Sequence, residues 1–215
     1  QKYSNPLPDI LIIVHPQATF FTKEYNLFPD VPKILINNQP KIADSFFSGD
    51  NSIYGFFGTD FKSNIEHCLE LFPDTKKIYV VRGDGIIGKN NEQSFIEDTK
   101  DLRPKVSFEY LRSLDVDELM NRVQSLPEHS IIYYLVYTKN PHNRSVYAMD
   151  IGKKLGEHAN KPVFVFMDMF TETGILGGKV ISIESMAIWA SDITRRVFNG
   201  EDINILYQQK INDPQ

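Results

Sequence analysis

The feature that most constrains the fold of this chain is a set of short runs that are apolar at nearly every position. A strand with one face in water alternates apolar and polar residues, whereas a strand buried on both faces does not. Buried strands of this kind occur in parallel sheets that helices cover on both faces. Five runs predict such strands: Asp9–Val14, Lys33–Asn37, Lys77–Arg82, Ile131–Tyr137 and Pro162–Met167. Val106–Leu111 alternates and indicates a strand at the edge of a sheet.

Amphipathic stretches of helical length lie between these runs. Four of them predict helices: Asp60–Phe72, Asp115–Leu126, Ser145–Ala159 and Glu184–Phe198. The only cysteine, Cys68, falls on the apolar face of the first stretch and is expected in the core. The aromatic pairs Phe20-Phe21 and Phe46-Phe47 are expected there too. Because strands and helices alternate along the chain, the predicted fold class is α/β with doubly wound parallel sheets.

Composition and charge exclude several classes of protein. The formal net charge is −5 and the basic residues are scattered, which argues against a nucleic-acid partner. The longest apolar runs are too short to span a bilayer. A single cysteine excludes an internal disulfide and a cysteine-based zinc site, and the five histidines are too widely spread for a metal site. We therefore expect no metal and no cofactor.

Polar and aromatic residues follow the predicted strands, at the edge where open α/β sheets bind their ligands. The candidate ligand-binding residues are His15, Gln17, Asn37, Arg82, Asp84, Tyr137, Thr138, Asp168 and Phe170. Arg82 would suit a carboxylate or phosphate of the ligand, and Asp84 or Asp168 would suit an amine. Tyr137 and Phe170 could stack on an apolar or cationic group.

A catalytic alternative rests on the segment Gly83–Asn90, which matches the phosphate-loop pattern except at its last position. That pattern needs Ser or Thr to hold magnesium, and here Asn90 takes its place. Asp84 would also set a carboxylate against the phosphate oxygens. A nucleotide hydrolase or sugar-nucleotide transferase is therefore the less favoured hypothesis, and a glycine-permitted turn into a helix is the simpler one. The sequence contains no nucleophile elbow, and no catalytic residue is predicted.

Several segments together resemble a known family. They are Pro8–Val14, Leu27–Pro32, Leu71–Pro73 followed by Lys77–Val81, Pro162–Phe166, Thr173–Lys179, and a helix that ends at Val197–Gly200. The pattern is similar to that of periplasmic-binding-protein-like sensor domains, which lie on the extracytoplasmic side of bacterial histidine kinases and related membrane signalling proteins. These domains are relatives of the substrate-binding proteins of ABC transporters.

The resemblance implies two Rossmann-like lobes with parallel sheets, of the type I periplasmic-binding-protein-like class, and a ligand between them. It assigns residues 1–57 and 180–215 to the first lobe and residues 58–179 to the second. The glycine-rich segment Gly174–Gly178 would mark a crossing between the lobes. In this family, a further strand, helix and strand precede the segment that matches Pro8–Val14, so we expect a truncated first lobe.

The function implied by the resemblance is sensing of a small molecule at the periplasmic face of the bacterial inner membrane. The domain itself would not be an enzyme, while its parent protein would be membrane-tethered and could carry a kinase or cyclase module. Sensor domains often act as pairs, so a homodimer is an open alternative. A substrate-binding component of an ABC transporter is the second hypothesis, because the sequence of the domain does not separate it from a receptor.

Overall fold

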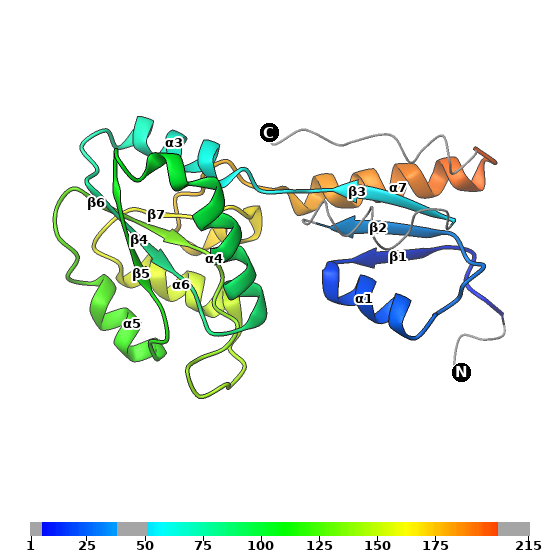
Figure 1. The fold of residues 1–215 in the computed structure, drawn as a ribbon, viewed down its shortest axis with the longest axis horizontal. Coiled ribbons are helices and arrows are strands. Elements are labelled where there is room, and N and C mark those ends of the chain that lie inside the picture. Colours follow the sequence, from blue (N-terminus) through cyan, green and yellow to red (C-terminus); the bar gives the residue numbers. More distant parts are fainter. Residues whose placement is uncertain (1–5, 38–50, 202–215) are drawn as a thin grey trace. The chain divides into compact units, whose positions relative to one another are not determined.

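The computed structural model describes residues 6–37 and 51–201 and shows two α/β units, each built on a parallel sheet (Figure 1). Unit 1 comprises residues 1–59 and 182–214, and unit 2 comprises residues 60–181. The chain therefore crosses from one unit to the other twice. The second aromatic pair, Phe46-Phe47, lies outside the described residues.

Unit 1 has a three-stranded sheet in the order β1-β2-β3, and both pairs of strands are parallel. Its elements are β1 (Leu11–Val14), α1 (Pro16–Glu24), β2 (Lys33–Asn37), β3 (Ser52–Phe56) and α7 (Ile183–Phe198). Helix α7 packs on this sheet through Trp189, whose ring meets Phe57 edge-on at 5.8 Å. The expectation that Phe20 and Phe21 lie in the core is wrong, because they are 41% and 54% exposed. Helix α1 instead buries Pro16, Thr19 and Thr22.

Unit 2 has a four-stranded parallel sheet in the order β5-β4-β6-β7. Its strands are β4 (Lys77–Val81), β5 (Ser107–Leu111), β6 (Ser130–Tyr134) and β7 (Val163–Phe164). Its helices are α3 (Phe61–Leu71), α4 (Ile86–Asp98), α5 (Val116–Val123) and α6 (Ala148–His158), with short 3-10 helices η1 (Lys100–Leu102) and η2 (Asp168–Thr173). The alternating run at Val106–Leu111 does form an edge strand, as predicted.

Helices cover both faces of the unit 2 sheet, which explains why β4 and β6 are apolar throughout (Figure 1). On the face of Tyr133, Phe61 of α3 and Phe95 of α4 pack against its ring at 6.2 and 5.3 Å. On the opposite face, the hydroxyl of Tyr134 donates to the carbonyl of Ala148 at the start of α6. Cys68 is fully buried, as predicted, and burial raises the pKa of its thiol to about 12.

The strand predicted at Pro162–Met167 is shorter in the structure because its second half pairs with a later segment instead of β6. The amide of Val165 donates to Gly177 at 2.8 Å, and the amide of Asp168 donates to Ile181 at 3.2 Å. These contacts lay residues 175–181 beside β7 in a parallel direction. This extended segment leads out of unit 2, so the glycines of Gly174–Gly178 lie immediately before the second crossing.

A buried asparagine of α3 fixes this outgoing segment. Asn64 is fully buried, and its side-chain amide donates to the carbonyls of Lys179 at 2.8 Å and Val165 at 3.4 Å. Its side-chain oxygen accepts from the amide of Lys179 at 3.3 Å. Gly178 has a φ of 142°, and a Cβ there would lie 2.7 Å from that oxygen. The first turn of α3, at the start of unit 2, is thus hydrogen-bonded to residues 178–181 at the end of unit 2.

Candidate functional site

The carboxyl edge of the unit 2 sheet is the candidate site. The chain connects β4 to β5 on one side and then crosses to β6 on the other, so the order of strands reverses between β4 and β6. Open α/β sheets bind ligands outside such a switch point, because the two connecting loops lead away in opposite directions. The loops concerned are the segment after β4, from Arg82 to Gly85, and the segment after β6, from Leu135 to Val146.

These two loops pack directly against each other. The amide of Gly83 donates to Val136 at 3.3 Å, and the amide of Asp84 donates to Lys139 at 2.8 Å. A Cβ at Gly83 would lie 2.6 Å from the carbonyl oxygen of Lys139, and a Cβ at Gly85 would overlap the hydroxyl of Thr138. The two loops are therefore in close contact at Gly83 and Gly85.

The same contacts argue against the phosphate-loop hypothesis. A phosphate loop binds its nucleotide through backbone amides that point into an open cradle. Here the amides of Gly83 and Asp84 are already bonded to carbonyls of the neighbouring loop. Lys89, which would have to reach the phosphates, is an exposed residue of α4. The segment leads into α4, which begins at Ile86, as the simpler alternative expected, and its glycines in addition permit the close approach of the two loops.

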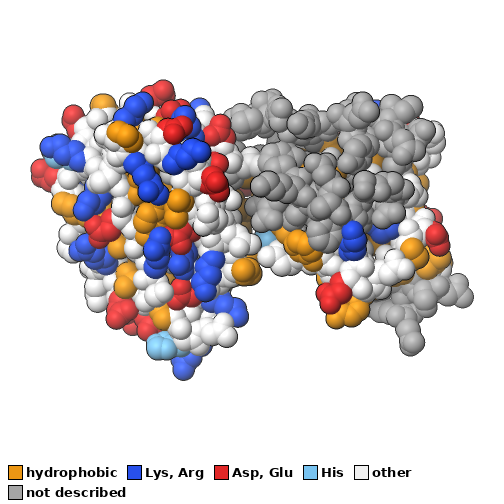
Figure 2. All heavy atoms as spheres, viewed as in Figure 1, with side chains coloured by type: hydrophobic (Ala, Val, Ile, Leu, Met, Phe, Trp, Pro, Cys, Tyr) orange, Lys and Arg blue, Asp and Glu red, His pale blue; other side chains and the backbone are white. Residues whose placement is uncertain are grey.

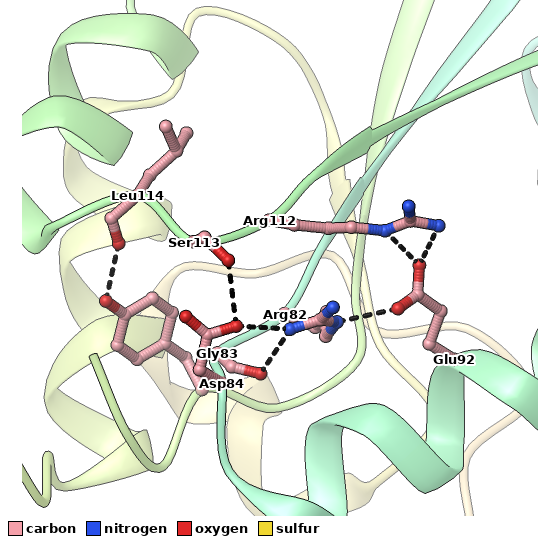
Figure 3. A network of polar contacts seen from close by, with 8 residues as sticks. Arg82, Gly83, Asp84, Glu92, Arg112, Ser113 and Leu114 are labelled. Carbon is pink, nitrogen blue, oxygen red and sulfur yellow. Dashed lines mark hydrogen bonds and ion pairs between the residues drawn. The ribbon is translucent and has the colours of Figure 1, made fainter. Parts of the chain in front are cut away.

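Arg82 lies in a network of four charged side chains, two basic and two acidic (Figure 3). Its Nε donates to Glu92 Oε2 of α4 at 2.7 Å, and one Nη donates to Asp84 Oδ1 at 2.7 Å. Arg112, which follows β5, donates to the other oxygen of Glu92 at 2.5 Å. The side chains of Arg82 and Glu92 are only 9% and 8% exposed. The network joins the loops after β4 and β5 to α4 and balances its own charge.

Glu92 and Arg112 were not among the residues selected from the sequence. Arg112 stacks on the ring of Tyr110 at 4.6 Å, and Ser113 donates to Asp84 at 3.0 Å. A signal for Glu92 was present, because it falls on the buried side of α4 between Gly88 and Phe95. A charged residue at such a position needs a partner of opposite charge, and here Arg82 and Arg112 supply it.

Tyr137 and Thr138 lie beside this network. The ring of Tyr137 is buried, and its hydroxyl donates to the carbonyl of Leu114 at 2.6 Å. Burial, with the nearby carboxylates of Asp115, Asp84 and Glu118, raises the pKa of Tyr137 to about 12, so the phenol is neutral. Thr138 is half-buried, and its carbonyl accepts from Val146 at 2.9 Å. The structure thus brings Arg82, Asp84, Tyr137 and Thr138 together.

Asp168 and Phe170 lie further along the same edge, in η2 after β7. Phe170 is 1% exposed, and its ring meets that of Tyr134 edge-on at 5.2 Å. It is therefore a core residue in this structure and presents no ring face to solvent. Asp168 is half-buried at the start of η2, where its carbonyl accepts from the hydroxyl of Thr171.

The three candidates from the first lobe lie at the carboxyl edge of the unit 1 sheet. His15 follows β1 with a φ of 80°, and its amide donates to Ile36 at 2.8 Å. Gln17 is exposed in the first turn of α1, and Asn37 is the last residue of β2. His15 and Gln17 therefore belong to unit 1 alone. That they share a ligand with Arg82, Asp84 and their neighbours stays a prediction.

The described residues offer neither a metal site nor a membrane-spanning helix. Over residues 6–37 and 51–201, no group of three or more His, Cys, Asp or Glu side chains is arranged to hold a metal ion. Within the same ranges, none of the helices has both the length and the apolar character needed to cross a bilayer. On the face of unit 2 in Figure 2, basic and acidic side chains are interspersed.

Comparison with solved structures identifies the fold. The ligand-free, open structure of CD0873, a substrate binding protein with adhesive properties from Clostridium difficile, aligns with a TM-score of 0.64 at 16% identity. The alignment covers 98% of this chain and 70% of that one. The fold is that of the type I periplasmic-binding-protein-like class. The predicted fold class is confirmed, while the truncation of the first lobe stays a prediction.

Two further neighbours agree with this assignment. A conserved domain protein from Vibrio cholerae has a TM-score of 0.64 at 14% identity, over 94% of this chain and 68% of that one. The ABC domain in complex with L-Trp from Streptococcus pneumoniae has a TM-score of 0.63 at 15% identity, over 93% and 66%. No protein-family model and no curated protein matches the sequence. At these identities the likeness concerns the fold and leaves the ligand open.

Proposed function

We propose that this chain is an extracytoplasmic domain that binds a small molecule at the carboxyl edges of its parallel sheets and catalyses nothing. The observation that supports this most is the fold, since the named neighbours are a substrate binding protein and an ABC domain in complex with L-Trp. The polar loops after β4 and β6 supply hydrogen-bonding groups at the edge where ligands of open α/β sheets lie. The close contact of the two loops at Gly83 and Gly85 disfavours the nucleotide alternative.

On unit 2, the residues proposed to contact the ligand directly are Asp84, Thr138 and Asp168. Arg82 is engaged by Glu92 and Asp84, so its proposed role is to hold Asp84 in place. On unit 1 the proposed contacts are His15, Gln17 and Asn37. Tyr137 and Phe170 are buried, and a role for them requires that their loops move on binding.

The proposed mechanism is a shift of population between open and closed arrangements of the two units. A ligand that contacts both units binds the closed arrangement better, and only this difference in affinity can move the equilibrium. In a transport setting the closed form would be presented to a permease. In a sensor setting the closed form would change the activity of a membrane-tethered signalling module, which could act as a homodimer.

The names of the neighbours favour the transport setting. The sequence resemblance to sensor domains keeps the second setting as a candidate. The parent polypeptide separates them, because a transmembrane helix followed by a kinase or cyclase module indicates a receptor.

A thermal-shift screen of the whole chain tests binding itself, with L-tryptophan, other amino acids, small carboxylates and sugars as probes. At a concentration of about 100 Kd, a ligand adds about 2.7 kcal/mol to the free energy of unfolding. For a chain of this size that corresponds to a rise in Tm of roughly 5–10 °C. No shift with any probe class would contradict direct binding of small molecules.

A matched pair of variants then locates the site. Thr138→Val should abolish most of the shift, because it removes a hydroxyl at the carboxyl edge while keeping the size of the side chain. Thr75→Val is the control, since Thr75 is also half-buried but precedes β4 at the opposite edge of the same sheet. Equal shifts in the two variants would place the ligand elsewhere.

A further inference from the structure

Three large apolar side chains are exposed at the carboxyl edge of the unit 2 sheet. They are Ile86 at 61%, Tyr147 at 67% and Met169 at 36% exposure. Each stands at the start of a segment that follows a strand, since Ile86 opens α4, Tyr147 caps α6 and Met169 is the second residue of η2. We call these three residues the apolar rim.

Most of the exposed apolar side chains described in unit 2 belong to this rim. Besides the rim, only Leu71 and Leu176 are exposed large hydrophobics among its described residues. Leu71 ends α3 just before β4, at the amino edge. The amide of Leu176 bonds to Val163, the first residue of β7. Exposed apolar surface in unit 2 is therefore concentrated at the edge where a ligand is expected.

Contacts of neighbouring residues connect the segments that carry the rim. Thr138 lies against Gly85, the residue before Ile86, and accepts from Val146, the residue before Tyr147. The segment that carries Met169 lies against α6. The ring of Phe170, next to Met169, would lie 3.0 Å from a Cβ at Gly152 of that helix. The segments that carry the three side chains are thus connected through Thr138 and through Gly152 of α6.

The charged groups next to the apolar rim neutralise one another. Arg82 and Arg112 share Glu92, and Arg82 also holds Asp84 at 2.7 Å. The buried part of the edge therefore offers a ligand little unbalanced charge. Exposed apolar surface is common on proteins, but its gathering beside a polar ligand edge is typical of small-molecule sites, which combine apolar walls with a few polar groups.

We infer that the ligand carries a bulky apolar group, an aromatic ring or a branched aliphatic chain, which rests on Ile86, Tyr147 and Met169 while Thr138 supplies a hydrogen bond. This inference rests on the proposed function and names the chemical class of its ligand. It separates the ligands of this chain from small, fully polar solutes such as glycine, acetate or glucose.

The test uses pairs of probes that share a polar part and differ in the apolar group. The pairs are L-tryptophan with glycine, 3-phenylpropionate with acetate, and phenyl β-D-glucoside with glucose. Isothermal titration of the whole chain should show that, in at least one pair, the apolar member binds at least about tenfold more tightly, which is about 1.4 kcal/mol.

Variants assign that preference to the rim. Tyr147→Ala should weaken binding of the preferred probe about tenfold, because it removes the one ring of the apolar rim, which is also its most exposed side chain. Leu71→Ala is the matched control, since Leu71 is 56% exposed at the opposite edge, and it should leave affinity within about twofold. Both expectations follow from the loss of apolar contact at the site alone.

Each contrary outcome has a distinct meaning. Equal binding within every pair, or unchanged affinity in Tyr147→Ala, would overturn the inference and leave the proposed function intact. A change of oligomeric state in Tyr147→Ala without a change in affinity would show that the rim is a protein contact and would also overturn it. Failure of all six probes to bind would count against the proposed function itself.

Discussion

At the scale of single residues, Glu92 connects the charged side chains of the candidate site. Its side chain is 8% exposed and bonds two arginines that follow different strands. A buried carboxylate is tolerated only when opposite charges and hydrogen bonds replace its lost hydration. Glu92 therefore sets the position of Arg82 and, through it, of Asp84.

Replacing Glu92 by glutamine should destabilise the chain strongly. The substitution keeps the shape of the side chain but leaves Arg82 buried with one counter-charge fewer, and breaking a buried pair in this way costs about 3 kcal/mol. Urea denaturation measures the change in the free energy of unfolding. Glu97→Gln is the control, because Glu97 is exposed on the same helix and should change stability by about 0.5 kcal/mol at most. A loss below about 1 kcal/mol for Glu92→Gln would contradict the account of the network.

The sequence was sufficient to place the candidate residues but not to pair them. Arg82, Asp84, Thr138 and Asp168 follow their strands as expected, because a buried strand is readily recognised and its last residue marks the edge. Which charges meet depends on how loops after different strands lie, and no local pattern encodes this. Arg82 therefore looked available for a ligand carboxylate, whereas Glu92 and Asp84 already bind it.

At the scale of elements, the outgoing segment Gly174–Ile181 depends on α3. Asn64 provides three hydrogen bonds to backbone groups of Val165 and Lys179. Lys179 adds a bond from its ammonium to the hydroxyl of Ser63 at 2.6 Å. The start of α3 and the segment at the end of unit 2 are therefore hydrogen-bonded to each other.

Asn64→Ala should loosen this junction. The variant leaves buried backbone groups without partners, and the expected loss of stability is about 3 kcal/mol, from about 1–3 kcal/mol for each unsatisfied group. Hydrogen exchange of the amides of Lys179 and Ile181 should become faster at the same time. Asn90→Ala, at an exposed position of α4, should leave both properties unchanged. Normal protection of Lys179 in Asn64→Ala would show that the segment does not depend on this side chain.

Helices and strands were predicted correctly where a run of buried apolar residues defines them. They were predicted less correctly where their hydrogen-bond partners decide the bounds. The strand expected at Pro162–Met167 is only Val163–Phe164 in the structure. Beyond Phe164 the chain makes a single bridge, from Met167 to Ile181, which is too short to form a strand. The first helix was misjudged at Phe20 and Phe21. Its buried side is formed by Pro16, Thr19 and Thr22, so small side chains and not aromatic ones face the sheet.

At the scale of the whole molecule, each unit has a parallel sheet with helices packed on it, and the chain crosses between the units twice. This architecture was predictable because uninterrupted apolar strands are compatible with few folds. The nature of the ligand was not, since it depends on side chains that loops bring together. The apolar rim is an example, because Ile86, Tyr147 and Met169 are separated by 61 and 22 positions in the sequence.

The most direct test of the central claim is an amide chemical-shift titration of the labelled chain with the probe that gives the largest thermal shift. The account predicts that the amides of Asp84, Thr138 and Tyr147 move most within unit 2, since they lie at the carboxyl edge of its sheet. Amides at the amino edge, such as those of Thr75 and Lys105, should stay in place. The largest changes at Thr75 and Lys105, with none at Asp84 and Thr138, would contradict a ligand site at the carboxyl edge.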